Sequence, residues 1–205
     1  MTTTRLAILL SGRGSNFAAI HDAIGRGILP AEIVAVISNR AAAPGIELAR
    51  QRNLPTHLID HSRFASREAH ESAVMAVLDE ARPDFIVLAG YMRLLTSSFI
   101  ARYPNRIVNI HPSLLPAFAG VNAQEQALRY GVKVTGCTVH FVDENLDAGR
   151  IILQRCVTVE SDDDVDTLSS RILEQEHIAY VEALALLTRG NFQIEGRRVK
   201  FLPSR

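Results

Sequence analysis

The sequence predicts a single α/β domain: a Rossmann-like, mostly parallel twisted sheet with helices on both faces. Short continuous apolar runs, such as residues 5–10 and 33–38, alternate with stretches of helical periodicity. Such runs are typical of parallel strands that are buried on both faces. In the second half, residues 134–142 and 151–159 flank a polar loop, which predicts an antiparallel hairpin at the C-terminal edge of the sheet.

The individual elements follow in chain order. The expected strands are 5–10, 33–38, 56–59, 85–89 and 106–110, and the expected helices are 16–26, 45–52, 67–81 and 97–102. Pro112 ends the last of these strands. Three aspartates at 162–164 place negative charge at the positive end of a final helix, which we expect to run to about Arg189 and to end at Gly190. No internal repeat or linker is visible, so we expect one domain over 1–205.

The composition indicates a soluble globular protein that acts on a small molecule. Of 205 residues, 47% are hydrophobic and 21% are charged, with 22 basic and 22 acidic side chains. The formal net charge is therefore zero, and no basic field attracts nucleic acid. Cys137 and Cys156 fit no metal-binding spacing, and we expect both in or near the core in a reducing compartment. No membrane span or export signal is visible, so we expect a cytoplasmic protein.

A glycine-rich turn, Ser11-Gly12-Arg13-Gly14-Ser15-Asn16, lies between the first expected strand and the first helix. Free amides at a helix start at the carboxyl end of a strand are suited to binding phosphate. A dinucleotide fingerprint would require a third glycine at Phe17 and an acidic residue where the second strand ends at Ser38-Asn39-Arg40. The sequence therefore disfavours NAD, and it lacks the lysine of a nucleoside triphosphate loop. A plain strand-to-helix turn remains the alternative.

Asn109 and His111 are two residues apart at the end of a strand, so their side chains leave the same face. An amide can donate a hydrogen bond to a developing oxyanion, and a protonated imidazole can stabilise the same charge. Asp147, in the loop of the expected hairpin, could hold the imidazole protonated or accept a proton. The alternative is a structural histidine beside a capping asparagine, because nothing local brings Asp147 near His111.

The segment Asn109-Ile110-His111-Pro112-Ser113-Leu114-Leu115-Pro116 resembles the hallmark of the folate-dependent formyltransferases. Further matching segments occur in family order over nearly the whole chain. They are 12–16, 87–93, 136–142 and 146–149, together with Gln175-Glu176-His177. The combination is similar to the branch of the family that formylates glycinamide ribonucleotide in purine biosynthesis.

The resemblance implies a reaction and a set of catalytic residues. The amine of glycinamide ribonucleotide would attack the formyl carbon of 10-formyltetrahydrofolate, the co-substrate, without a metal. Asn109 and His111 would stabilise the oxyanion, and Asp147 would position the histidine and assist proton transfer. This agrees with the chemistry of the residues, since an amine needs no activated side-chain nucleophile. His140 could support these groups, but a strand histidine is usually structural, and we do not count it as catalytic.

The resemblance also implies ligand contacts. The phosphate would lie on the amides of Gly14, Ser15 and Asn16, and Glu176 would bind the ribose hydroxyls. Glu176 falls in line with the apolar stripe of Val165, Leu168, Ile172 and Ala179, where a carboxylate needs partners. A pairing with His177 or an arginine is the alternative. The residues expected to bind folate are Arg67, Met92, Arg93, Leu94, Leu95, Asp143, Glu144, Asn145 and Leu146. A Met and Leu stripe in the core is the alternative there.

Three other functions compete with this one. A formyltetrahydrofolate deformylase would normally carry a preceding regulatory domain, and a methionyl-tRNA formyltransferase would continue into a second domain. A phosphate-binding module would make Asn109, His111 and Asp147 incidental. Asn122 stands where many family members have histidine, which puts a catalytic role for that position in doubt. We expect residues of about 1–105 to bind phosphate and those of about 106–205 to carry catalysis and folate binding, in a monomer or homodimer without nucleic-acid or membrane partners.

Overall fold

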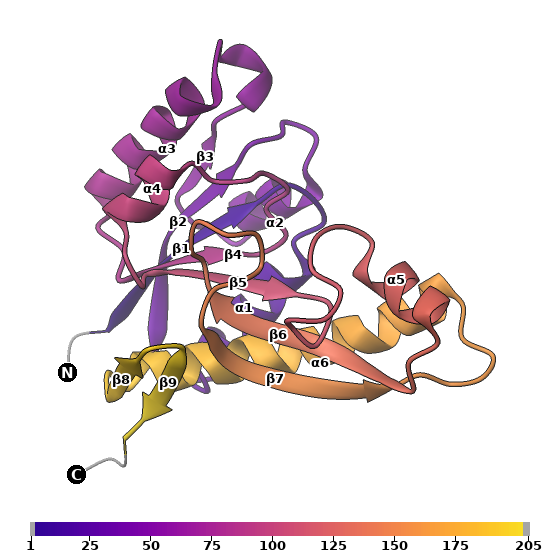
Figure 1. Ribbon diagram of the computed structural model, residues 1–205. Helices are drawn as coiled ribbons and strands as arrows, with labels where there is room; N and C mark the ends of the chain where they lie inside the picture. Colours follow the sequence, from indigo (N-terminus) through magenta and orange to yellow (C-terminus); the bar gives the residue numbers. More distant parts are fainter. Residues whose placement is uncertain (1–2, 203–205) are drawn as a thin grey trace. The chain divides into compact units, whose positions relative to one another are not determined.

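The computed structural model describes residues 3–202 and contains two compact units, Met1–Val108 and Asn109–Arg205. Each unit has its own strands and helices, which Figure 1 labels. The expectation of a single domain over 1–205 stays a prediction. Among the described residues, no helix is both long enough and apolar enough to cross a membrane.

The first unit is a parallel α/β arrangement. Its strands are β1 (Thr4–Leu10), β2 (Ala31–Ser38), β3 (Thr56–Leu58) and β4 (Phe85–Leu88). They follow the order β3-β2-β1-β4, and every neighbouring pair is parallel. The helices are α1 (Ser15–Gly25), α2 (Pro44–Gln51), the 3₁₀ turn η1 (His61–Arg63), α3 (Arg67–Ala81) and α4 (Ser97–Arg102). Side chains 6–10 of β1 are fully buried, as expected of a central parallel strand.

The second unit combines strands with one long helix. Strand β5 (Ile107–His111) crosses the boundary between the units, and β6 (Val134–Phe141) and β7 (Ile151–Thr158) follow in the order β5-β6-β7. Strands β6 and β7 pair antiparallel from Val134 opposite Thr158 to His140 opposite Ile151. Helix α6 (Val165–Thr188) packs along both of them (Figure 1). The expected α/β class and its antiparallel hairpin edge are therefore confirmed.

Of the three aspartates that we expected at the start of the last helix, Asp164 caps it. Asp164 is the N-cap of α6: its carboxylate accepts the Thr167 amide at 2.8 Å, while the Thr167 hydroxyl accepts the Asp164 amide at 2.9 Å. This reciprocal pair stabilises the helix start. The helix ends at Thr188, and Gly190 follows in the left-handed region with φ 70°. Both ends of the expected helix therefore agree with the structure to within a few residues.

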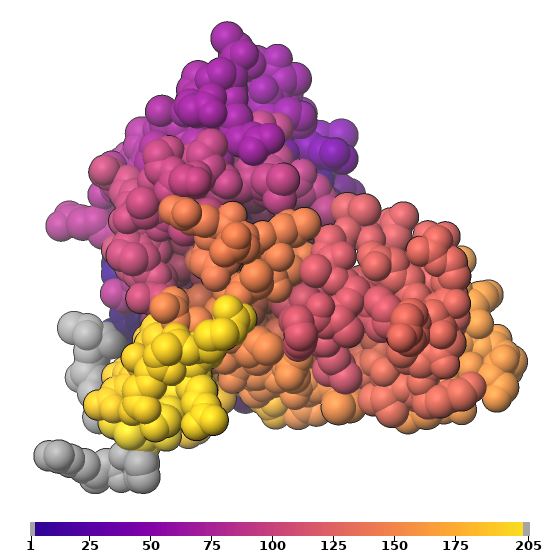
Figure 2. Space-filling view, in the orientation of Figure 1, coloured from indigo at the N-terminus to yellow at the C-terminus, as the bar shows by residue number. Residues whose placement is uncertain are grey.

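Four features differ from the sequence predictions. Helix α5 (Ala123–Tyr130) was not expected, because only Ala123 and Ala127 of its eight residues are buried and they give little periodic signal. The hairpin of β8 (Phe192–Glu195) and β9 (Arg198–Phe201) was also missed, and it lies at the surface of the second unit (Figure 2). Val165 is 43% exposed rather than buried, since it is the first residue of α6. Cys156 is exposed because it lies on edge strand β7.

Candidate functional site

Asn109 and His111 lie at the end of β5, and each contacts a residue from elsewhere in the second unit. The Asn109 amide nitrogen lies 3.3 Å from Nε2 of His140, which comes from β6. The other nitrogen of that ring, Nδ1, donates to the Phe141 carbonyl at 3.0 Å. Nε2 is then the acceptor, because burial lowers the pKa of His140 and keeps the ring neutral. His140 therefore fixes which way the Asn109 amide faces.

His111 contacts acceptors through both of its ring nitrogens. Nε2 donates to the Phe118 carbonyl at 2.8 Å, and Nδ1 lies 3.4 Å from Oδ2 of Asp147. The His111 and Asp147 side chains are only 7% and 10% exposed. A proton on either nitrogen therefore has a partner, and water has little access to the pair. The arrangement suits an imidazolium held between a carboxylate and a carbonyl.

Asp147 is contacted by a backbone amide and by two histidine rings from outside its own loop. Its Oδ2 accepts the Gly120 amide at 2.9 Å, and its Oδ1 lies 3.8 Å from Nε2 of His140. Asp147 has φ 48°, in the left-handed region that aspartate adopts more readily than most residues. The carboxylate is therefore oriented mainly through Oδ2, which lies between the Gly120 amide and the His111 ring. The structure thus brings together His111 and Asp147, which no local sequence signal connected.

The segment that follows Pro116 supplies two backbone groups that the sequence analysis missed. Phe118 contributes its carbonyl to His111, and Gly120 contributes its amide to Asp147. Phe118 has φ 53°, a conformation that costs energy in a bulky residue and that turns up at functional sites. Backbone groups are the same in every residue type, so no sequence pattern could reveal them. Asn122 has φ 57° and begins α5, a position that suits asparagine.

The glycine turn lies in the first unit, between β1 and α1. Gly14 is the N-cap of α1 with φ 76°, and a Cβ there would lie 2.8 Å from Cα of Gly45. Gly14 is therefore required by backbone geometry and close packing, whether or not a ligand binds. At Gly12 an added Cβ would meet nothing within 4 Å, so the turn is open on that side. The start of α1 has neither a side-chain cap nor an acidic residue in its first turn, a state that suits an anion.

A buried polar network connects this turn to the segment after β4. The Ser11 hydroxyl donates to Oδ1 of Asn39 at 2.5 Å and accepts the Met92 amide at 2.8 Å. The Ser11 amide donates to the Gly90 carbonyl at 3.0 Å. Ser11 and Asn39 are 4% and 2% exposed. Two polar residues at the carboxyl ends of buried strands are the sequence signal for this network.

The segment 90–96 is fixed at both ends and exposes apolar side chains between them. Ser11 holds its start, and Glu71 of α3 accepts both the amide and the hydroxyl of Thr96, with the amide at 2.9 Å. Met92 and Leu94 are 72% and 57% exposed, so they are not core residues. Large apolar side chains on a fixed exposed segment are typical of a ligand-contacting surface. Leu95 and Arg93 are partly buried, and Arg67 is exposed at the start of α3.

Glu176 lies on the buried stripe of α6 and is 8% exposed. Leu168, Ile172 and Ala179 of the same stripe are fully buried, as expected. The Glu176 carboxylate is close enough to Cys137 to add to the effect of burial, which raises the pKa of that thiol to about 12. Nε2 of His177 is buried without a hydrogen-bond partner among residues 3–202, so this atom does not pair with Glu176. The pairing with His177 is thus not seen at that nitrogen.

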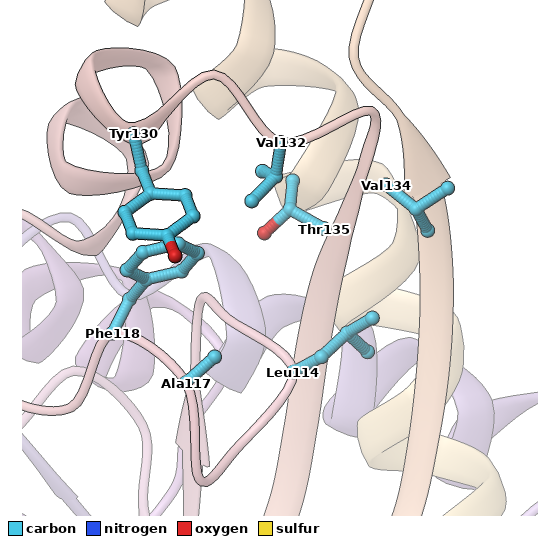
Figure 3. A pocket seen from close by; sticks show the side chains of 7 residues that line it. All are labelled: Leu114, Ala117, Phe118, Tyr130, Val132, Val134 and Thr135. Atoms are coloured by element: carbon cyan, nitrogen blue, oxygen red, sulfur yellow. The ribbon is translucent and has the colours of Figure 1, made fainter.

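A cavity of about 460 Å³ opens on the second unit beside this cluster (Figure 3). Its lining is almost entirely apolar: Leu114, Ala117, Phe118, Tyr130, Val132, Val134 and Thr135. The cavity shares Phe118 with the His111 contact but includes neither His111, Asn109 nor Asp147. It has no charged group for a phosphate or a carboxylate. The amide, imidazole and carboxylate of the cluster therefore lie outside the lining of this cavity.

A small-molecule transfer enzyme is the class that this α/β fold and its amide, imidazole and carboxylate define. A family model described as "Formyl transferase" matches residues 4–184, and the chain belongs to this family of enzymes. The phosphoribosylglycinamide formyltransferase of Escherichia coli K12 is 40% identical over 92% of this chain and 89% of its own length. The crystal structure of glycinamide ribonucleotide transformylase 1 from Symbiobacterium toebii superposes with a TM-score of 0.95 at 47% identity, covering 98% of this chain and 95% of that one.

The chain also resembles part of a longer protein. The human trifunctional purine biosynthetic protein adenosine-3 is 46% identical over 93% of this chain, which spans 19% of the length of that relative. The family that the motifs of the sequence indicated is therefore confirmed.

Proposed function

We propose that this enzyme transfers the formyl group of 10-formyltetrahydrofolate to the amine of glycinamide ribonucleotide in purine biosynthesis. The observation that carries the proposal is the His111–Asp147 pair, at 3.4 Å, at the end of the strand that bears Asn109. The proposal draws further support from the relatives in Escherichia coli and Symbiobacterium toebii, whose names state this ribonucleotide.

Asn109 and His111 act on the oxygen of the formyl group, which the folate co-substrate supplies. One amide proton of Asn109 is directed to His140, which leaves the second to donate to the oxygen as negative charge develops there. Nε2 of His111 is bonded to the Phe118 carbonyl and Nδ1 faces the Asp147 carboxylate at 3.4 Å, so in this arrangement neither nitrogen is directed at the oxygen, and a protonated ring would act on it through its charge. A direct hydrogen bond from His111 would require the Phe118 carbonyl or the Asp147 carboxylate to move away.

Asp147 handles the proton that the attacking amine loses. As the amine forms its bond to the formyl carbon, its proton must leave, and the folate nitrogen must gain one when its bond to that carbon breaks. The Asp147 carboxylate is fixed by the Gly120 amide and is 10% exposed, so it can hold this proton, directly or through a water, without exchange with bulk solvent. The same carboxylate stabilises a protonated His111.

The remaining site residues bind the ligands. Gly14, Ser15 and Asn16 present the start of α1 to the phosphate, and Glu176 accepts hydrogen bonds from the ribose hydroxyls. Met92, Arg93, Leu94 and Leu95 contact the folate, and Arg67 pairs with its glutamate tail. The backbone of Asp143, Glu144, Asn145 and Leu146 reads the edge of the pterin. No group of three or more His, Cys, Asp or Glu side chains within the described range 3–202 is arranged to hold a metal ion.

An acceptor-dependence assay tests the function. Purified protein is mixed with 10-formyltetrahydrofolate, and release of tetrahydrofolate is followed with and without glycinamide ribonucleotide. We expect release only when the ribonucleotide is present, with one formylated ribonucleotide formed per tetrahydrofolate. Release without it would mean that water is the acceptor and that the protein is a deformylase. No release in either case would rule out the enzyme activity.

Glu176→Gln tests the ribose assignment. The substitution keeps the shape and one carbonyl oxygen but removes the charge, so we expect KM for the ribonucleotide to rise by ~10-fold. KM for the folate should change by less than about twofold, because the lost contacts are to the ribose. Glu174→Gln is the matched control, since Glu174 is exposed on the same helix. Equal effects of Glu176→Gln on both KM values would contradict the assignment.

A further inference from the structure

The loop that carries Asp147 is closed at its base by strict backbone contacts. The Phe141 amide donates to the Arg150 carbonyl at 2.9 Å, where β6 ends and β7 is about to begin. A Cβ at Gly149 would lie 1.6 Å from the Phe141 carbonyl oxygen, so only glycine fits there. The base of the loop is therefore rigid. The residues beyond it, including Asp147, need other contacts to keep their conformation.

Those contacts come from the turn of the β8–β9 hairpin. The Arg197 guanidinium donates from Nη2 to the Ala148 carbonyl at 2.8 Å and lies 3.5 Å from the Gly149 carbonyl. In the opposite direction, Nε of Arg150 donates to the Gly196 carbonyl at 2.7 Å. Each segment thus supplies an arginine to the backbone of the other. Hydrogen bonds from a charged donor are among the stronger ones in proteins.

The hairpin is anchored well enough to act as a support. The ring of Phe192 lies 6.0 Å from that of Phe141 and 6.2 Å from that of Phe201. Phe141 is 1% exposed and directly precedes the Asp147 loop. Strand β9 contacts β7, and the yellow hairpin lies against the orange part of the chain on the face drawn in Figure 2. The aromatic contacts therefore fix the hairpin to the strand from which the loop begins.

We propose that Arg197 is a positioning residue for Asp147, and that the β8–β9 hairpin holds the catalytic loop through it. Asp147 has φ 48°, and its Oδ2 must stay near Nδ1 of His111 while the residue keeps this unfavourable conformation. Arg197 binds the carbonyl of the next residue, Ala148, so it restrains the peptide unit between Ala148 and Gly149, directly after Asp147, and limits how the backbone at Asp147 can turn. This inference rests on the proposed function, in which Asp147 handles the proton.

Steady-state kinetics with a matched pair of variants test the positioning role. Arg197→Ala should lower kcat by ~10-fold, because a small misplacement of a catalytic group is costly, while KM for the ribonucleotide changes by less than about twofold. Arg198→Ala is the control, because the same charge is lost from the neighbouring position of the hairpin, which is exposed like Arg197. Arg197→Lys retains one donor and should recover part of kcat. Equal kcat values in Arg197→Ala and Arg198→Ala would overturn the proposal.

Two further measurements separate this role from general stabilisation and from the reaction itself. In an Asp147→Asn background, Arg197→Ala should change kcat by less than about twofold, because a residue that acts through Asp147 has nothing left to position. Hydrogen exchange needs no activity: amides 145–149 should exchange ~10-fold faster in Arg197→Ala and at the wild-type rate in Arg198→Ala. If the wild type transfers no formyl group, the proposed function fails. The hydrogen-exchange rates of amides 145–149 then still test whether Arg197 positions the loop. Unchanged exchange in Arg197→Ala would overturn the positioning role.

Discussion

Asp147→Asn is expected to lower kcat for formyl transfer by ~10³–10⁴-fold. The substitution preserves the shape of the side chain, and the asparagine oxygen can still accept the Gly120 amide that Oδ2 accepts at 2.9 Å. What is lost is the negative charge 3.4 Å from Nδ1 of His111, together with the acceptor for the amine proton. Both losses act on the chemical step. Rapid-quench measurement of a single turnover should therefore show the full decrease.

Folding must be checked separately from chemistry in this variant. Asp162→Asn is the control, because it removes the same charge from an exposed position in the second unit. Both variants should unfold cooperatively with similar midpoints, and only Asp147→Asn should lose turnover. A well-folded Asp147→Asn enzyme that keeps kcat within about tenfold of wild type would exclude the proton-handling role. Asp147 would then be a structural residue of its loop.

The parallel core of the first unit could be predicted from the sequence because burial on both faces leaves a continuous apolar pattern. Side chains 6–10 of β1 are fully buried, and no polar residue interrupts that run. Helix α5 and the β8–β9 hairpin lie at the surface and bury few side chains, so their sequences carry weaker periodicity. Periodicity can also predict burial that does not occur. Val165 fits the helical period of α6 but is exposed, because it lies on the first turn of the helix.

Only part of the candidate site could be predicted from the sequence. Asn109 and His111 could be paired from the sequence, since strand geometry alone sends both side chains to one face. The contact of His111 with Asp147 depends on a left-handed residue in a loop, which the sequence does not encode in a recognisable pattern. The Phe118 carbonyl, the Gly120 amide and the Arg197 contact with Ala148 all involve backbone atoms. Such contacts depend on the fold and on no particular residue type at the backbone position.

His140 illustrates how a residue set aside in a sequence analysis gains a role from geometry. As a strand histidine it has a structural explanation, and its ring does bond to the backbone carbonyl of Phe141. The same ring, however, accepts the amide of Asn109. Because burial lowers the pKa of His140, the acceptor persists as pH falls below the usual range of histidine. Protonation at still lower pH would put a second N–H toward Asn109 and remove the contact.

Asn109→Ala is expected to lower the chemical rate by ~10²–10³-fold, the usual loss for one oxyanion donor. The amide donates only as charge develops on the formyl oxygen, so KM for both substrates should stay within about twofold of wild type. His140→Ala leaves the Asn109 amide without its partner at 3.3 Å, so it should cause a smaller loss of ~10-fold. In the double variant the two losses should not add, because His140 acts on Asn109. A folded Asn109→Ala enzyme with wild-type turnover would contradict the oxyanion role. So would an enzyme in which only KM rises and kcat is unchanged.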